Sequence, residues 1–396
     1  MRIFALLPLL VAECGSGGPP AEAEPEAERA LEEPSPAEVA LDTRVTTRSD
    51  IAVRNFQARV EALREQQRRA PQDLALRATL VEHLLARATF LGTFDDFDEA
   101  DTLSRGREGP EGALLRASFL SAVHRFEEAR AKLAEAARLG APEHLVERAR
   151  LVVDLAVGED PAGLLPRART LTAASESYAH WTVLASVLAA LGRYEQADAT
   201  YLRALSIYRD TSPFPLAWVS FTRGVMWGEA AGRPDRARVL YADAVARLPD
   251  YVVANVHLSE LEEPEQARAR LEGVLASGDP EPSARLAQRL DGPRRAALFA
   301  RARARYESLL SRHREAFLDH ASEFYAMVGE PQRALELALE NLTVRRNGRA
   351  YVVALRAAEA AGEQATVCRL VDEAAPLRTR HRVLDALAAE LEGRCP

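Results

Sequence analysis

Residues 181–213, WTVLASVLAALGRYEQADATYLRALSIYRDTSP, decide the fold of this chain. Apolar residues recur at positions i, i+3, i+4 and i+7 of two short segments, one on each side of Gly192. The first segment carries this pattern from Trp181 to Leu188, and the second carries it from Tyr194 to Leu205. Alanines in both segments leave room for two helix backbones to approach each other. The stretch therefore predicts two packed amphipathic helices joined by a short turn at Gly192.

The same stretch resembles the tetratricopeptide repeat, a family of antiparallel helix pairs with aromatic, glycine and alanine residues at fixed places. The matching positions are Trp181, Leu184, Ala185, Gly192, Arg193, Tyr194, Ala197, Tyr201, Ala204 and Leu205. This resemblance implies an all-α fold, a right-handed superhelical solenoid of helix pairs. Proteins of this family usually bind peptides or extended segments on the concave face of the solenoid.

The pattern repeats along most of the chain. In each predicted pair, one residue of the second helix serves as a marker of the repeat. The markers are Ala129, Gly163, Ala197, Ala237, Ala267, Ala300, Ala334 and Val367. Their spacings of 30 to 40 residues lie around the 34-residue period of the family. We therefore expect about eight to nine helix pairs in residues 48–396, with a terminal helix over residues 379–393.

The first 47 residues have a different composition from the rest. Arg2 and the apolar run over residues 3–12 are typical of a signal peptide. Residues 11–14, Val-Ala-Glu-Cys, resemble the lipobox of bacterial lipoproteins, in which the cysteine receives a lipid; Glu13 departs from the small residue that the family has there. The resemblance implies a signal peptide at residues 1–14 and lipidation of Cys14. Residues 15–47 are rich in Pro, Ala, Gly and Glu, which predicts a disordered acidic tether.

This N-terminus predicts a membrane-anchored lipoprotein of the bacterial cell envelope. Plain secretion, to a soluble location in or beyond the periplasm, and an uncleaved cytoplasmic N-terminus are the alternatives. After Cys14, the chain has two further cysteines, Cys368 and Cys395. Two buried free thiols are the default expectation, and a disulfide that holds the last helix against the preceding pair is the alternative in an oxidising compartment.

The charge distribution and the motifs exclude several classes of function. Residues 1–50 contain ten acidic residues and four arginines, so most of the net charge of −8 lies there. The rest of the chain is nearly neutral. A near-neutral body lacks the basic surface patch that a nucleic-acid-binding protein needs.

Motifs of common enzyme classes do not occur in the sequence. Lys132 is the sole lysine, and phosphate-loop, nucleophile-elbow and zinc-protease motifs are all missing. We therefore expect a non-catalytic protein without cofactor or metal. His320 and Glu323 share a helix face and could meet at a metal, but a solvated charged face is the favoured interpretation.

A partner is expected on the concave face, where the first helix of each pair presents the residues not used for stacking. The candidate residues are Thr182, Ser186, Trp218, Thr222, Met226, Glu229, Asp319, Glu323, Arg349, Arg356 and Glu359. The favoured hypothesis is a scaffold or adaptor that binds another protein or peptide segment there. A structural or assembly subunit of an envelope machine, such as a secretion or export complex, is the first alternative. An enzyme with an unrecognised site is the second.

Overall fold

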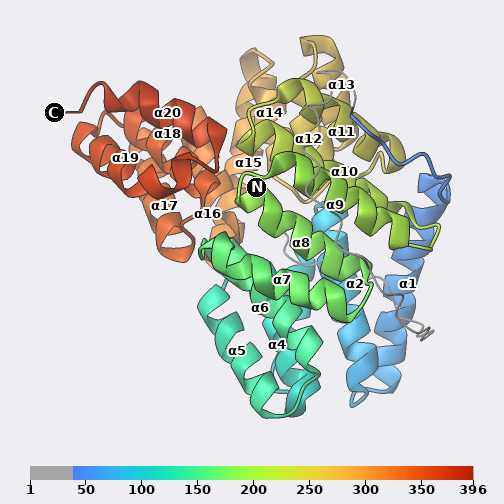
Figure 1. The fold of residues 1–396 in the computed structure, drawn as a ribbon. Coiled ribbons are helices and arrows are strands. Elements are labelled where there is room, and N and C mark those ends of the chain that lie inside the picture. The colour runs from blue at the N-terminus through green and yellow to red at the C-terminus, as the bar shows by residue number, and fades with distance from the viewer. Residues whose placement is uncertain (1–38, 396) are drawn as a thin grey trace.

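The computed structural model describes residues 39–395, and these residues form α-helices and one π-helical turn without any β-strand (Figure 1). The predicted signal peptide, Cys14 and most of the tether lie outside the described residues. The helices are α1 (Ser49–Arg69), α2 (Leu74–Leu91), α3 (Asp96–Ser104), α4 (Gly109–Ala122), α5 (Phe126–Arg138), α6 (Glu143–Val157), α7 (Pro161–Ala174), α8 (Tyr178–Ala190), α9 (Tyr194–Ile207), α10 (Pro213–Val225), η1 (Met226–Ala230), α11 (Pro234–Arg247), α12 (Val252–Ser259), α13 (Pro264–Gly273), α14 (Glu281–Ala287), α15 (Gly292–Arg312), α16 (Arg314–Met327), α17 (Pro331–Val344), α18 (Gly348–Ala360), α19 (Gln364–Arg378) and α20 (Arg382–Glu392). Among them, no helix is long and apolar enough to cross a membrane.

The stretch that decides the fold forms α8 and α9, as predicted. Tyr194, Ala197 and Tyr201 are almost completely buried between the two helices and their neighbours. Gly192 makes the turn with φ +74°, a conformation that favours glycine. A Cβ atom on Gly192 would also lie 3.1 Å from the Cα atom of Arg380 in the loop between α19 and α20. This glycine is therefore required by its backbone angle and by a distant part of the chain.

The remaining helices repeat this pairing, which confirms the all-α helical solenoid. From α4 to α19, each even-numbered helix packs antiparallel against the odd-numbered helix that follows it. The even-numbered helices face the interior of the superhelix. In α12, for example, every residue is buried, whereas α13 buries only Ala267 and Leu271. The concave side is thus an interior rather than an open surface.

All eight repeat markers lie in the second helix of a pair, but two of them are not buried. Gly163 and Ala300 are exposed, whereas the other six markers are buried. In α7 the adjacent Leu164 takes the buried position, and in α15 the buried alanine is Ala302. The periodicity therefore locates each pair correctly but misses the packed residue by one or two positions where the second helix departs from the family pattern.

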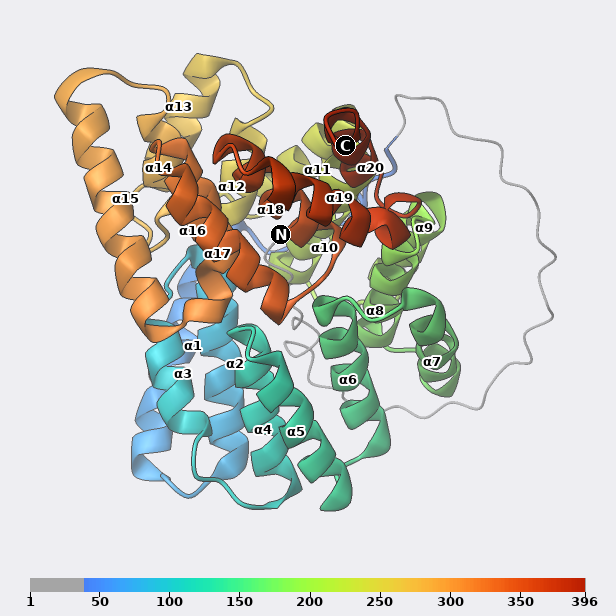
Figure 2. The same ribbon diagram turned by 90° about the vertical axis from the view of Figure 1, so that its left-hand side faces the viewer.

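The superhelix closes on itself, so repeats far apart in the sequence lie side by side (Figure 2). The backbone N–H of Arg346 donates to the carbonyl of Val157 at 2.8 Å, and the Tyr194 hydroxyl donates to the carbonyl of Arg380 at 2.6 Å. Helices α18 and α20 also contact η1. These contacts attach the C-terminal repeats to the middle of the chain.

The ordered body begins before residue 48, the boundary predicted from the sequence. Residues 39–47 lie along α9 to α11. Arg44 donates through Nη1 to the carbonyl of Tyr208 at 2.5 Å, and the backbone N–H of Thr47 donates to the carbonyl of Thr211 at 2.8 Å. These residues contain few large apolar side chains, so composition assigns them to the tether, but they are ordered by hydrogen bonds to helix ends.

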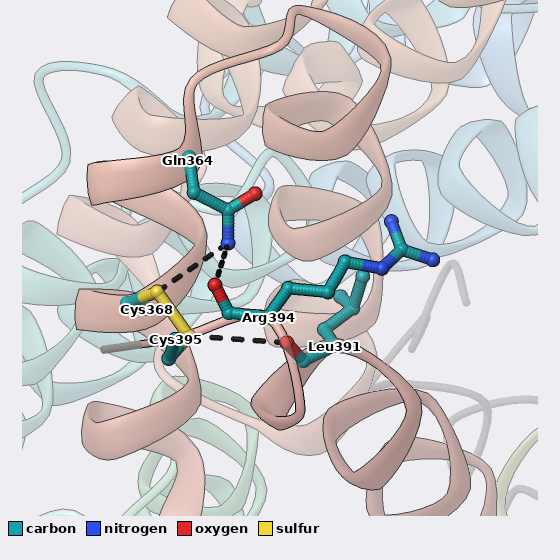
Figure 3. Close-up of a disulfide and its surroundings, with 5 residues drawn as sticks. All are labelled: Gln364, Cys368, Leu391, Arg394 and Cys395. Carbon is teal, nitrogen blue, oxygen red and sulfur yellow. Dashed lines mark hydrogen bonds between the residues drawn. A yellow bond between two sulfur atoms is a disulfide. The ribbon is translucent and has the colours of Figure 1, made fainter.

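The C-terminal end is held by a disulfide (Figure 3). Cys368 on α19 and Cys395, which follows α20, are joined with a Cα–Cα distance of 5.5 Å. The amide of Gln364 donates to the carbonyl of Arg394 at 3.2 Å beside this bond. The disulfide connects the last helix to the preceding pair, so the default expectation of two free thiols is wrong and the alternative drawn from the sequence is the one that the structure shows.

We predict that Gly192→Ala destabilises the protein more than Gly362→Ala. Both glycines have nearly the same φ, +74° and +72°, but an added Cβ meets Arg380 at Gly192 and open space at Gly362. The shared backbone strain should cost about 1–2 kcal/mol of the free energy of unfolding in each variant. Urea unfolding of both variants measures the difference. Equal losses would show that the approach of the added Cβ atom to Arg380 has no steric cost.

Candidate functional site

A cavity of about 440 Å³ lies inside the superhelix. One wall is formed by α8, α10 and η1. The other comes from the connection between α6 and α7, at residues 158–161, and from two C-terminal segments, residues 345–349 and 376–381. The cavity therefore exists only because the superhelix closes, and its size is in the range of small-ligand sites.

The wall formed by α8 and α10 is apolar. Val183 from α8 and Trp218, Phe221 and Val225 from α10 face the cavity. Trp218 is only partly buried, although it packs on two apolar clusters of the core. Apolar groups of a ligand can pack on this wall without displacing hydrogen bonds of the protein.

The π-helical turn η1 brings polar and apolar residues to the cavity together. It follows α10 directly, and its Met226 and Glu229 both line the cavity. Gly224 and Gly228 allow this segment to sit close to α11, because a Cβ atom on Gly224 would lie 2.6 Å from the ring of Tyr241. A π-turn widens the helix by one residue and is frequent at functional sites.

Charged side chains from five helical elements and two loops form a network that reaches the cavity at Glu229, Arg345 and Arg349. We name them the concave charge cluster, which consists of Glu229, His257, Glu260, Glu281, Arg285, Asp319, His320, Glu323, Arg345 and Arg349. Arg349 is its centre: the guanidinium lies 2.7 Å from Glu229, 3.1 Å from Glu323 and 3.7 Å from Asp319. Arg345 lies 2.8 Å from Asp319. The cluster joins η1 to α16 and α18 through buried ion pairs.

The arginines keep the buried carboxylates ionised. Burial by itself would raise the pKa of Glu229, but the positive charge of Arg349 holds that pKa below its usual value. Burial opposes ionisation of Asp319 in the same way, and Arg345 and His320 hold its pKa well below the usual value. The inner end of the cavity, lined by Glu229 and Arg349, is therefore charged at neutral pH, and Asp319 stays ionised behind it.

Two histidines near the cavity are kept neutral. Burial lowers the pKa of His257, and nearby Glu229 offsets part of this effect. Burial also lowers the pKa of His381 to about 4. The Nδ1 atom of His381 accepts the backbone N–H of Leu384 at 3.1 Å, so the imidazole caps the start of α20 in its unprotonated form.

The structure brings together nine of the eleven candidate residues for partner binding. Seven line the cavity, namely Thr182, Ser186, Trp218, Thr222, Met226, Glu229 and Arg349. Asp319 and Glu323 join them through Arg349. Arg356 is exposed on α18 outside the cavity wall, and Glu359 forms an ion pair with Arg394 at 2.8 Å.

Trp227 in η1 has a structural role, unlike Trp218. Trp227 is buried, and its indole Nε1–H donates to Asp198 at 2.9 Å. The guanidinium of Arg236 lies 4.1 Å from its ring centroid. Trp227 therefore joins η1 to α9 and α11, whereas Trp218 faces the cavity.

Sequence reasoning missed the loop residues that close the cavity. Arg345, Arg346, Asn347, Arg380 and His381 all line it. They precede α18 or α20, and the repeat phase assigns partner binding to the helices rather than to these turns. No local signal identifies them, because their position depends on contacts between repeats about 190 residues apart, as in the bond from Arg346 to Val157.

Comparison with known proteins gives similarity at the level of the fold. No protein-family model and no curated protein matches the sequence. Among solved structures, the chain is similar to one in the APC/C hetero-tetramer Cut9–Hcn1, with 14% identity, a TM-score of 0.42 and coverage of 82% of this chain. It spans 63% of that chain. A tetratricopeptide repeat protein from Parabacteroides merdae gives 13% identity, a TM-score of 0.30 and coverage of 72% of this chain and 98% of that one.

We predict that His381 makes folding stability fall between pH 6.5 and pH 4. In that range, the unfolded chain binds a proton at His381 and the folded protein does not, so acidification favours unfolding. His381→Asn retains a capping side chain and should reduce the loss between pH 7 and pH 5 by about 1–2 kcal/mol. Urea unfolding at both pH values measures this loss. The control is His144→Asn, at an exposed histidine, which should behave as wild type. The same loss in His381→Asn and wild type would contradict the prediction.

Proposed function

We propose that this protein is a non-catalytic helical-repeat scaffold of the bacterial cell envelope that binds a segment of a partner protein in its concave cavity. The observation that carries the proposal is the cavity itself. Seven residues selected from the sequence alone, six by the repeat phase and Trp218 as an aromatic candidate, line one apolar space with a charged end. Buried apolar anchors with a few polar contacts are the usual composition of a protein-binding hot spot.

The closed superhelix sets the form of the expected partner. Because loops 345–349 and 376–381 cover the concave side, a long helix cannot lie along it as in an open solenoid. A short extended segment can insert a few apolar side chains beside Trp218 and Met226. Polar groups of the segment can then bond to Thr222 and Glu229.

The N-terminal sequence supports the envelope location. An apolar run followed by Cys14 and an acidic Pro/Ala/Glu-rich stretch is the order of elements expected of a lipid-anchored, tethered domain. The disulfide between Cys368 and Cys395 suits an oxidising compartment on the outer side of the inner membrane.

We predict that Thr222→Glu weakens partner binding at least tenfold. Thr222 is partly exposed at the apolar wall, so a carboxylate there disfavours apolar side chains without disturbing the core. A photo-crosslinking amino acid at position 222 of the full chain should capture a defined segment of a partner in envelope preparations. Titration of that segment as a synthetic peptide then gives the affinities of wild type and variant.

Position 239 is the matched control for position 222, both for the crosslinker and for the change to Glu. Val239 is 40% exposed on α11. A crosslinker at position 239 should not capture the same segment, and Val239→Glu should leave the affinity unchanged. Equal capture at the two positions, or equal affinities of the two Glu variants, would contradict binding in the cavity.

We predict that Cys14→Ser moves the protein from the membrane to the soluble fraction of the producing bacterium. Without a thiol at position 14, no lipid can be attached. Metabolic labelling with a fatty acid and fractionation measure the effect, with Cys368→Ser as the control that should stay in the membrane. Membrane retention of the unlabelled Cys14→Ser protein would contradict lipid anchoring and leave the cavity proposal unaffected.

A further inference from the structure

The charged residues that line the cavity are almost all paired. They are Glu159, Asp160, Glu229, Arg345, Arg346, Arg349 and Arg380. Ion pairs join Glu159 to Arg130 and Asp160 to Arg380, both at 2.7 Å, and also Glu229 to Arg349 at 2.7 Å and Arg345 to Asp319 at 2.8 Å. A charge that already has an opposite partner attracts a ligand of either sign only weakly. A lining charge without such a partner therefore selects the charge of a ligand.

The concave charge cluster lies largely behind the cavity wall. Sequence reasoning favoured a solvated charged face for His320 and Glu323, but His320 is 2% exposed, so that interpretation is wrong. Glu323 accepts hydrogen bonds from Arg349 at 3.1 and 3.2 Å. A partner segment therefore meets the cluster at the members that line the cavity, Glu229, Arg345 and Arg349.

Arg346 is the charged lining residue without an ion pair. Within residues 39–395, its side chain takes part in no ion pair and no hydrogen bond, and it is exposed. Its backbone is fixed, because its N–H donates to the carbonyl of Val157 at 2.8 Å. A Cβ atom on Gly158 would lie 2.5 Å from the carbonyl oxygen of Arg346, so the two turns pack closely. The fold therefore holds one uncompensated positive charge at the edge of the cavity.

The apolar wall and this charge belong to the same cavity. Val183, Trp218 and Val225 line it together with Arg346. A short segment can therefore contact both, with apolar side chains on the wall and one charged side chain at the edge. A carboxylate there is attracted to the guanidinium, which can bind it through two parallel hydrogen bonds. A lysine or arginine at the same place is repelled.

We propose that the partner segment carries an aspartate or glutamate beside its apolar residues, and that Arg346 binds this carboxylate. The inference rests on the proposed binding of a segment in the cavity. An ion pair at an exposed site adds little affinity, but like charges at that site disfavour the wrong partner. The apolar wall thus supplies most of the affinity, and Arg346 determines specificity.

The test uses the immobilised full chain with Cys14→Ser, which prevents lipid attachment. The probes are three pools of short peptides with blocked termini and random apolar residues, in which one fixed position is Glu, Gln or Lys. Mass spectrometry measures the amount of each pool that is retained. Wild type should retain the Glu pool roughly threefold to tenfold better than the Lys pool, with the Gln pool between them. Arg346→Glu should reverse this order.

The matched control is Arg356→Glu. Arg356 is exposed on α18, lies outside the cavity wall and also forms no ion pair within residues 39–395. This variant should keep the wild-type order of the pools. If it reverses the order as Arg346→Glu does, the selection comes from overall charge and the role of Arg346 is wrong.

Thr222→Glu separates the two proposals. It should lower the retention of all three pools, because it acts at the apolar wall. Equal retention of the three pools by wild type, with lower retention by Thr222→Glu, would leave partner binding intact and overturn the role of Arg346. Wild type that retains no pool better than Thr222→Glu does would overturn binding in the cavity and, with it, the role of Arg346.

Discussion

Arg349 is the residue on which the interior of this protein depends. Its guanidinium lies within ion-pair distance of Glu229, Asp319 and Glu323, which belong to two elements about 90 residues apart in the sequence. A buried charge is tolerated only when it is paired, so this guanidinium fixes η1 relative to α16 and α18. A solenoid whose repeats contacted only their neighbours would not need such an interaction. Here it holds one turn of the superhelix closed.

The cavity follows from that closure. In an open solenoid, the apolar face of α10 around Trp218 and Val225 would lie in a wide groove. The loops before α18 and α20 instead reach across to the end of α6, with Arg346 bonded to Val157. An apolar space with a charged inner end remains between them. Partner binding is therefore proposed at the apolar wall of a space whose inner end is fixed by Arg349.

The sequence predicted much of the candidate site and missed a definable part of it. Thr182, Ser186 and Thr222 could be selected because the repeat phase fixes which face of the first helix points inward. Arg356 and Glu359 have the same phase but lie in the last pair, where the disulfide-linked end of the chain takes the place of a following repeat. His381 could not be found, because a turn residue carries no periodic signal. Its role depends on the α19–α20 loop meeting the turn at Gly192.

The sequence by itself determined the helix pairs and their order, since amphipathic periodicity, turn glycines and small residues act over a few positions along the chain. Tyr194, Ala197 and Tyr201 are buried as that local pattern requires. Only the tertiary structure decided that the superhelix closes, that residues 39–47 pack on α9 to α11, and that Glu281 meets His320. Small rotations between successive repeats accumulate over the whole solenoid, and no short stretch of sequence records their sum. Contacts between distant repeats therefore appear only when the complete chain is folded.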